Sequence, residues 1–354
     1  MDMLLMNYNH LLLHHLKKIT TLLLCCCCFS TATASNSLSI HSKDYRFMVD
    51  SAIRVNHLES SNSSHQLFLG FDYQYIFKRQ QSDNATLILQ PMLVKLHNVM
   101  QPFNYFSDGD DVDLQWRAAF INYTGLSRGQ FNIRAGHIEL PFGAEFNAFI
   151  TGGTLRQLTT NIGQKMDWGI SANGQINQFD YEIAYTRGSG NEWDRADGAG
   201  IVSGRIAFNH SAKHHWGLSF LHGDLVPAKA NQLVEKRRTA IDYLYSHGQL
   251  TVRGEISDGE DNGNDRQYGL AEVSRFSNNR DLFWYAQYRY QKNFDPANQI
   301  HRSQKDIILG NEWRPHLNTE ISTQLRSNVS HKNASNAPAV ENSLFQIQVR
   351  YRFL

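Results

Sequence analysis

The sequence has few cysteines, and all of them lie together near its start. The 354-residue chain has four cysteines, Cys25 to Cys28, and none after them. The rest of the chain therefore has no disulfide, no thiolate metal site and no cysteine nucleophile. A small domain held together by disulfides is excluded as well. The 34 Lys and Arg nearly balance the 33 Asp and Glu, which gives no support to nucleic-acid binding.

Long apolar runs are also scarce. The run Ile19–Ser30 is too short for a membrane-spanning helix, which needs about 20 residues. Lys17 and Lys18 precede it, and Ala32-Thr33-Ala34 follows it. This order of charge, apolar run and small residues is typical of a secretory signal. We predict a signal peptide over residues 1–34 and an exported protein over residues 35–354.

Two details of the signal remain open in the sequence. The segment before the apolar run is long for a signal peptide, so the true start could be Met6. The cysteines at the end of the run would also permit a lipoprotein signal. Leu24, directly before Cys25, disfavours this alternative because a small residue is expected there.

After residue 34, apolar and polar residues alternate in many short segments. The alternation is clearest in the last twelve residues, SLFQIQVRYRFL, where every second residue from Phe345 to Phe353 is apolar. This pattern is typical of a β-strand whose two faces meet different surroundings. The near-terminal Phe353 is the type of residue that the barrel-assembly machinery recognises, although Leu354 follows it.

Sixteen segments of this kind can be delimited. Some rows contain many aromatic residues, as in Leu67 to Phe77, and others combine apolar and small residues, as in Met166 to Ala172. One row is read as Val112, Leu114, Trp116, Ala118 and Phe120. The predicted strands are residues 45–57, 66–79, 85–98, 111–124, 130–140, 165–176, 178–188, 201–209, 214–223, 237–246, 249–258, 266–276, 281–291, 304–314, 317–327 and 343–354.

The connections between the segments indicate a membrane barrel. Short turns alternate with long polar loops such as SGNEWDRADGAG, and an even strand number puts both chain ends on the short-turn side. Fourteen or eighteen strands are alternatives. A soluble β-sandwich also alternates, but 15 Tyr and 20 Phe suit aromatic girdles better than a soluble core. The sequence therefore predicts an all-β fold, a transmembrane antiparallel β-barrel of sixteen strands in the cell outer membrane.

One stretch of about 60 residues resembles a known family. Its matching residues are Gly136, Pro141, Phe142, Gly143, Gly169, Gly174, Tyr181 and Gly188. In this pattern the segment from Ile133 to Gly190 resembles the phosphate-selective porin O and P family of Gram-negative bacteria. The resemblance implies a water-filled, homotrimeric porin. It does not extend to phosphate selectivity, because the sequence lacks a dense ladder of Arg and Lys.

The longest connection without a strand pattern runs from Pro141 to Gln164. Its aromatic and aliphatic residues are poorly suited to a loop in water. Proline cannot donate to a β-ladder, and glycine permits tight bends. We predict that this segment folds into the barrel as a constriction loop; an ordinary external loop is the alternative. The predicted constriction residues are Glu139, Pro141, Phe142, Gly143, Glu145 and Arg156.

The polar faces of the strands carry charges of both signs. The arginines expected to face the lumen are Arg54, Arg117, Arg134, Arg205, Arg253, Arg289, Arg326, Arg350 and Arg352. Four of them, Arg54, Arg326, Arg350 and Arg352, fall on the first strand and the last two, which become neighbours when the barrel closes. We predict that this basic strip faces the constriction loop and gives a weak preference for anions. Charges that only hydrate the lumen and pair across strands are the alternative.

These observations predict a porin, a passive diffusion channel for small hydrophilic solutes and ions. We expect no enzyme activity, cofactor or metal site, because the 16 histidines are scattered and no G-x-S-x-G or H-E-x-x-H motif occurs. The expected partners are the lipid bilayer, the barrel-assembly machinery, further copies in a homotrimer, and small ions and solutes. Two alternatives remain: a structural or adhesive barrel with a plugged lumen, and a barrel that sheathes a periplasmic partner.

Overall fold

The computed structural model describes most of the chain that follows the predicted signal peptide. The described residues are 40–41, 44–58, 63–79, 82–97, 112–127, 129–144, 153–158, 165–193, 199–211, 213–226, 233–296, 300–333 and 340–353. The predicted signal peptide, residues 1–34, lies outside them. Within these ranges no helix has the length and apolar character needed to cross a membrane.

The described residues form sixteen long strands and one two-residue strand. They are β1 (Ile40–His41), β2 (Tyr45–Leu58), β3 (Ser64–Arg79), β4 (Ser82–His97), β5 (Val112–Tyr123), β6 (Asn132–Glu139), β7 (Met166–Ile176), β8 (Phe179–Thr186), β9 (Gly200–Asn209), β10 (His214–Leu225), β11 (Val234–His247), β12 (Leu250–Asp261), β13 (Asn264–Phe276), β14 (Leu282–Asp295), β15 (Ile300–His316), β16 (Thr319–Asn333) and β17 (Val340–Phe353).

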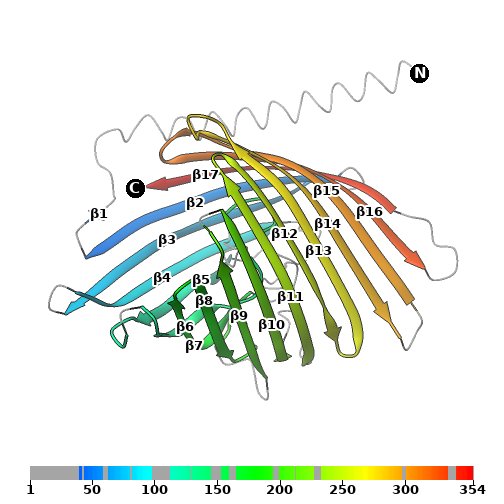
Figure 1. Ribbon diagram of the computed structural model, residues 1–354. Helices are drawn as coiled ribbons and strands as arrows, with labels where there is room; N and C mark the ends of the chain where they lie inside the picture. The colour runs from blue at the N-terminus through cyan, green and yellow to red at the C-terminus, as the bar shows by residue number, and fades with distance from the viewer. Residues whose placement is uncertain are drawn as a thin grey trace, which may run out of the picture.

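The sixteen long strands form one closed antiparallel barrel. Each pairs with the next along the chain, and β17 pairs with β2, with Gln348 opposite Arg54. Figure 1 shows β17 lying directly beside β2. A closed sheet leaves no unpaired edge for hydrocarbon or for another chain. The prediction of a sixteen-stranded antiparallel barrel is confirmed.

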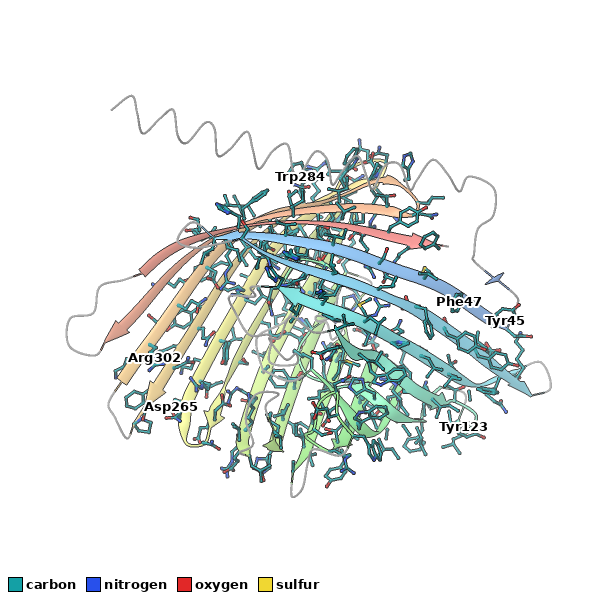
Figure 2. The ribbon with its side chains drawn as sticks, turned by 180° about the vertical axis from the view of Figure 1, so that it is seen from behind. Tyr45, Phe47, Tyr123, Asp265, Trp284 and Arg302 are labelled. Carbon is teal, nitrogen blue, oxygen red and sulfur yellow. The ribbon has the colours of Figure 1, made fainter. Side chains whose placement is uncertain are left out.

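The two ends of the barrel differ in their connections. At the short-turn end, where β2 begins and β17 ends, connections such as 177–178 and 248–249 contain two residues. The opposite end, named the long-loop end, has one tight connection among its longer ones. There Asn262 and Gly263 take positive φ angles of 48° and 76° between β12 and β13, as an Asn-Gly hairpin turn requires. In Figure 2, Tyr45 and Tyr123 lie at the short-turn end, and Asp265 and Arg302 at the other.

The alternation of residues along the strands separates a lipid face from a lumen face. On β14 the large side chain of Trp284 is exposed, whereas the neighbouring Phe283 and Tyr285 are buried. Many of the buried side chains are polar, including Asp50, Arg117 and Gln348. An apolar exterior around a polar interior is the arrangement of a transmembrane β-barrel.

A β-bulge changes the phase of β5. Gln90 pairs with Ala118 and Pro91 pairs with Trp116, so Arg117 is the extra residue. Proline has no N–H to donate, and it is found at such irregularities. Beyond the bulge the exposed residues are Ile121 and Tyr123. The prediction that Val112, Leu114, Trp116, Ala118 and Phe120 share one face is therefore wrong beyond the bulge: Ala118 is buried, and the Arg134 guanidinium lies over the Phe120 ring, 4.9 Å from its centroid.

Candidate pore constriction

The chain leaves the barrel wall at the end of β6. Glu139 is the last residue of this strand, and the Leu140 N–H still donates to the Lys165 carbonyl at 2.8 Å. Pro141 follows, and it has no N–H to continue the ladder. Strand pairing therefore ends where the sequence predicts.

Phe142 fixes the start of the inward segment against the lumen face of the wall. Its side chain is fully buried with Leu140 in a cluster that includes Ile201 of β9 and Leu221 of β10. Burial of a phenylalanine side chain stabilises a structure by roughly 1.5–3 kcal/mol. Phe142 therefore packs against the wall instead of projecting into the pore.

The next two residues are held by lumen side chains of β10 and β12. The Gly143 N–H donates to Ser219 Oγ at 3.1 Å, and the Ala144 N–H donates to Glu255 Oε2 at 3.1 Å. Gly143 has a φ of 91°, a conformation that glycine adopts readily. Glu145 follows directly and lies outside the described residues.

The chain is again described at residues 153–158, which we name the inner segment. The Gly153 carbonyl accepts a hydrogen bond from Gln348 of β17, and Thr154 donates to Glu312 of β15. These contacts place the inner segment inside the barrel, beside strands distant from β6. An ordinary external loop would not make them.

Arg156 of the inner segment contacts β13 and β14. Its Nη1 donates to Glu272 Oε1 at 2.7 Å, and its guanidinium lies 5.1 Å from the centre of the Phe283 ring. The sequence placed Arg156 in the constriction but did not identify either partner.

Arg253 of β12 and Gln287 of β14 bind the backbone of the inner segment. Arg253 donates to the carbonyls of Gln157 and Leu158, the latter at 2.5 Å, and Gln287 Nε2 donates to the Gln157 carbonyl at 2.6 Å. Both side chains also donate to Glu272 Oε2. A segment without a β-ladder needs such partners for its buried polar groups. The inner segment is thus fixed by side chains from β12 to β15 and from β17.

The predicted basic strip shares its carboxylates. Arg350 donates to both oxygens of Asp50, at 2.9 and 2.5 Å, and Arg352 lies 3.6 Å from the same carboxylate. Arg117 of β5 also reaches Asp50, at 2.7 Å, and binds Asp72. Three arginines therefore meet two aspartates at this point.

The other two arginines of the strip, Arg326 and Arg54, have fewer acidic partners than Arg350 and Arg352. Arg326 and Arg289 bind the single carboxylate of Asp306, at 3.1 and 2.5 Å. Arg54 donates to the neutral side chain of Gln348 at 2.9 and 2.7 Å. Because Gln348 also donates to the Gly153 carbonyl, it connects the strip to the inner segment. The strip with its two added members is named the arginine face: Arg54, Arg117, Arg289, Arg326, Arg350 and Arg352.

Salt bridges on the opposite wall are nearer to one cation per carboxylate. Arg205 binds Asp242 at 2.7 Å, and Arg134 binds Glu182 at 3.0 Å. Among these ion pairs the arginine face has more arginines than carboxylates bound to them; Glu320, opposite Arg350 on β16, pairs with Arg314. The sequence placed Arg117 and Arg289 in the lumen, but it could not show that they share acids with the strip.

A second cationic group lies at the long-loop end of β11 to β13. Asp261 lies 2.7 Å from Arg238, 3.1 Å from Arg266 and 3.7 Å from Lys236. Within the described ranges, no three His, Cys, Asp or Glu side chains are grouped so that they could hold a metal ion.

The fold is similar to several solved structures. No protein-family profile and no curated protein matches the sequence. OprB of Pseudomonas putida aligns with a TM-score of 0.64 and 10% identity over 88% of this chain and 94% of OprB. An anion-selective porin from Comamonas acidovorans aligns with a TM-score of 0.55 and 12% identity, over 87% of this chain and 99% of the porin.

A trimer form of OmpT from Vibrio cholerae is similar too, with a TM-score of 0.58 and 13% identity over 87% of this chain and 98% of OmpT. The chain has the fold of the outer-membrane porins. Identities this low show the fold alone, and the narrower resemblance to the phosphate-selective family is not shown.

Proposed function

We propose that the protein is a passive diffusion channel for small hydrophilic solutes and ions in the outer membrane, with a preference for anions. The arginine face carries the proposal: five of its six arginines share Asp50, Asp72 and Asp306 beside the fixed inner segment, and Arg54 binds the neutral Gln348. Clusters of uncompensated charge in a lumen set ion selectivity. Arg238, Arg266 and Lys236 around Asp261 add positive charge at the long-loop end.

The predicted constriction residues have two kinds of role in this proposal. Glu139, Pro141, Phe142 and Gly143 bring the chain away from the wall, and Arg156 lies in the part that narrows the pore. Glu145 belongs to the same inward connection. The channel acts without catalysis, cofactor or metal.

Assembly and export complete the proposal. Residues 1–34 direct export, and the barrel-assembly machinery recognises the last strand. The trimer form of the similar OmpT supports a homotrimer.

Single-channel recording of the purified protein in a planar bilayer tests the function. We expect a steady open level. In a KCl gradient, we expect the reversal potential to be shifted toward the equilibrium potential of chloride. The absence of any steady open level would favour a plugged structural barrel. A reversal potential shifted toward the equilibrium potential of potassium would contradict the anion preference.

A further inference from the structure

The lipid face of β8 to β11 has a hollow in the wall. The four strands lie side by side (Figure 1), and the hollow between their outward side chains has a volume of about 450 Å³. Ligand sites typically have volumes of roughly 300–1,000 Å³. Leu218 is 58% exposed and Ile206 is 47% exposed, so the hollow opens to lipid and not to the lumen. Its outward lining residues include Ile183, Gly204, Ile206, Leu218, Phe220 and Thr239.

Gly204 makes room for the hollow. It belongs to the outward row of β9, between the exposed Val202 and Ile206. A Cβ on Gly204 would lie 2.5 Å from Cε1 of the Phe220 ring, so the ring lies against the backbone of β9. Glycine inside a strand often marks such a close approach. Because Phe220 lies along the wall instead of standing out from it, the lipid face is concave at this point.

A row of aromatic side chains lies on the short-turn side of the hollow. The ring centroids of Phe179 and Phe208 are 5.1 Å apart, and those of Trp216 and Tyr243 are 4.3 Å apart. The strand register places these four residues side by side, two residues nearer the short-turn end than Leu218. Tryptophan and tyrosine concentrate at the level of the lipid headgroups. The row therefore marks the membrane boundary beside the hollow.

Basic side chains lie directly beyond the aromatic row. His210 and Lys213 are exposed in the turn between β9 and β10. His214 begins β10, and its Nδ1 lies 2.8 Å from Tyr243 Oη. His214 is four residues from Leu218, which corresponds to roughly 13 Å along a strand. Ammonium and imidazole N–H groups donate hydrogen bonds to phosphate oxygens, so this rim offers donors at headgroup level.

Among the described residues of β8 to β12, no carboxylate faces outward beside these basic groups. Four carboxylates lie in the middle or short-turn part of these strands, and all of them face the lumen: Asp180, Glu182, Asp242 and Glu255. The others lie at the long-loop end: Asp224, Glu235, Asp258, Glu260 and Asp261. The short-turn rim of this lipid face is therefore basic, whereas its opposite end is rich in acids.

We propose that an anionic phospholipid binds this face, with an acyl chain in the hollow and its phosphate at His210, Lys213 and His214. The apolar hollow suits the chain, and basic groups at a membrane surface attract anionic headgroups. A second copy meeting this face about a two-fold axis would instead bring the same basic groups together, and like charges across an interface are unfavourable. The site lies outside the wall and goes beyond diffusion through the lumen.

Native mass spectrometry of the purified protein tests the site. Equal amounts of dioleoylphosphatidylglycerol and dioleoylphosphatidylcholine, which differ only in their headgroups, are added in detergent. We expect each chain to retain one phosphatidylglycerol, at several-fold higher occupancy than phosphatidylcholine. Lys213→Gln combined with His214→Gln should abolish this preference. The matched control is Lys305→Gln combined with His301→Gln, at exposed positions near the long-loop end of β15, which should keep it.

Thr239→Phe tests the hollow by filling it, and the occupancy of both lipids should fall several-fold. Leu218→Trp fills the same space if Thr239→Phe does not fold. Val273→Phe enlarges a side chain on β13 that is 52% exposed, away from the hollow, and should leave the occupancy unchanged. Equal retention of the two lipids by the unchanged protein would overturn the proposal. The same holds for unchanged occupancy after the hollow is filled, or for equal loss of preference in the matched control.

Discussion

Arg350 and Asp50 form a bidentate ion pair across the junction of β17 and β2, with N–O distances of 2.9 and 2.5 Å. Arg350 lies on the last strand and Asp50 on the first long one, and both are buried. The pair therefore joins the two ends of the barrel sequence and also belongs to the arginine face. One carboxylate serves both barrel closure and the proposed selectivity.

Asp50→Asn tests the role of Asp50 in ion selectivity and its role in barrel closure by two separate measurements. Loss of one negative charge leaves Arg350, Arg117 and Arg352 less compensated, so the chloride-to-potassium permeability ratio should rise. Loss of the charge-assisted bonds should lower the free energy of unfolding by about 2–3 kcal/mol. Reversal potentials and urea titration measure the two effects. A fall in the permeability ratio would contradict the proposed role of the arginine face.

Arg54→Gln tests the arginine that has a neutral partner. Arg54 binds Gln348, so its removal takes away one positive charge without exposing a carboxylate. We expect the chloride-to-potassium permeability ratio to fall by roughly twofold, as removal of one lumen charge can do. Arg237→Gln is the matched control, because Arg237 is an exposed residue paired with Glu235. Equal ratios in the two variants would count against the prediction.

Arg253→Gln should loosen the inner segment. The substitution removes the donors to the Gln157 and Leu158 carbonyls and one partner of Glu272. We expect unfolding to become easier by about 3 kcal/mol and the open-channel current to become noisier. Single-channel recordings at constant voltage provide the measurement. A current as quiet as that of the unchanged protein would show that Arg253 does not hold the constriction.

Asp167→Asn should weaken residues 187–193, the irregular segment after β8, whose N–H groups at Gly188, Ser189 and Gly190 donate to the buried Asp167 carboxylate. The Gly188 N–H binds Asp167 Oδ2, whereas the N–H groups of Ser189 and Gly190 bind Oδ1. An asparagine keeps one of these oxygens, and its NH2 group cannot accept a hydrogen bond, so at least one of the three bonds is lost together with the negative charge. We expect a loss of about 1–3 kcal/mol of stability and faster proteolysis between residues 187 and 193. Asp180→Asn is a suitable comparison, because Asp180 binds the Asn209 side chain on a complete part of the wall. Equal proteolysis rates in both variants would argue against this role.

Period-two alternation was sufficient to locate the strands, because each face of the wall meets a different medium. Predicted residues 165–176 correspond to β7 at Met166–Ile176. The predicted strand 237–246 is shorter than β11 at Val234–His247. The charged residues Glu235 and Lys236 at the start of β11 resemble a polar loop. The Asn-Gly pair at 262–263 would have extended the two strands that it joins. The phase error at Phe120 arose because a bulge reverses the alternation, with Pro91 as its only mark in the sequence.

The constriction was harder to predict than the wall. Pro141 and Gly143 mark the end of pairing through their own backbone chemistry, and so the start of the inward segment could be located. Its partners Arg253 and Gln287 look like any other polar strand residue. The polar residues that contact the inner segment are determined by strand register and barrel closure. The alternation pattern of a single strand gives no information on either. Asn191 binds the Trp116 N–H and the Leu114 carbonyl of β5, beyond the part of β5 that the short β6 pairs with, and no strand pattern predicts this contact.

Pairing of β17 with β2 also has a kinetic consequence. The two strands are about 300 residues apart in sequence, as the Arg350–Asp50 bond shows, and contacts between such distant residues are slow to form. Until the last strand arrives, β2 and β16 each keep a row of unpaired N–H and C=O groups. Such edges invite pairing with other chains. The unfinished barrel is therefore the species most prone to aggregate, and its exposure ends only with the final residues of the chain.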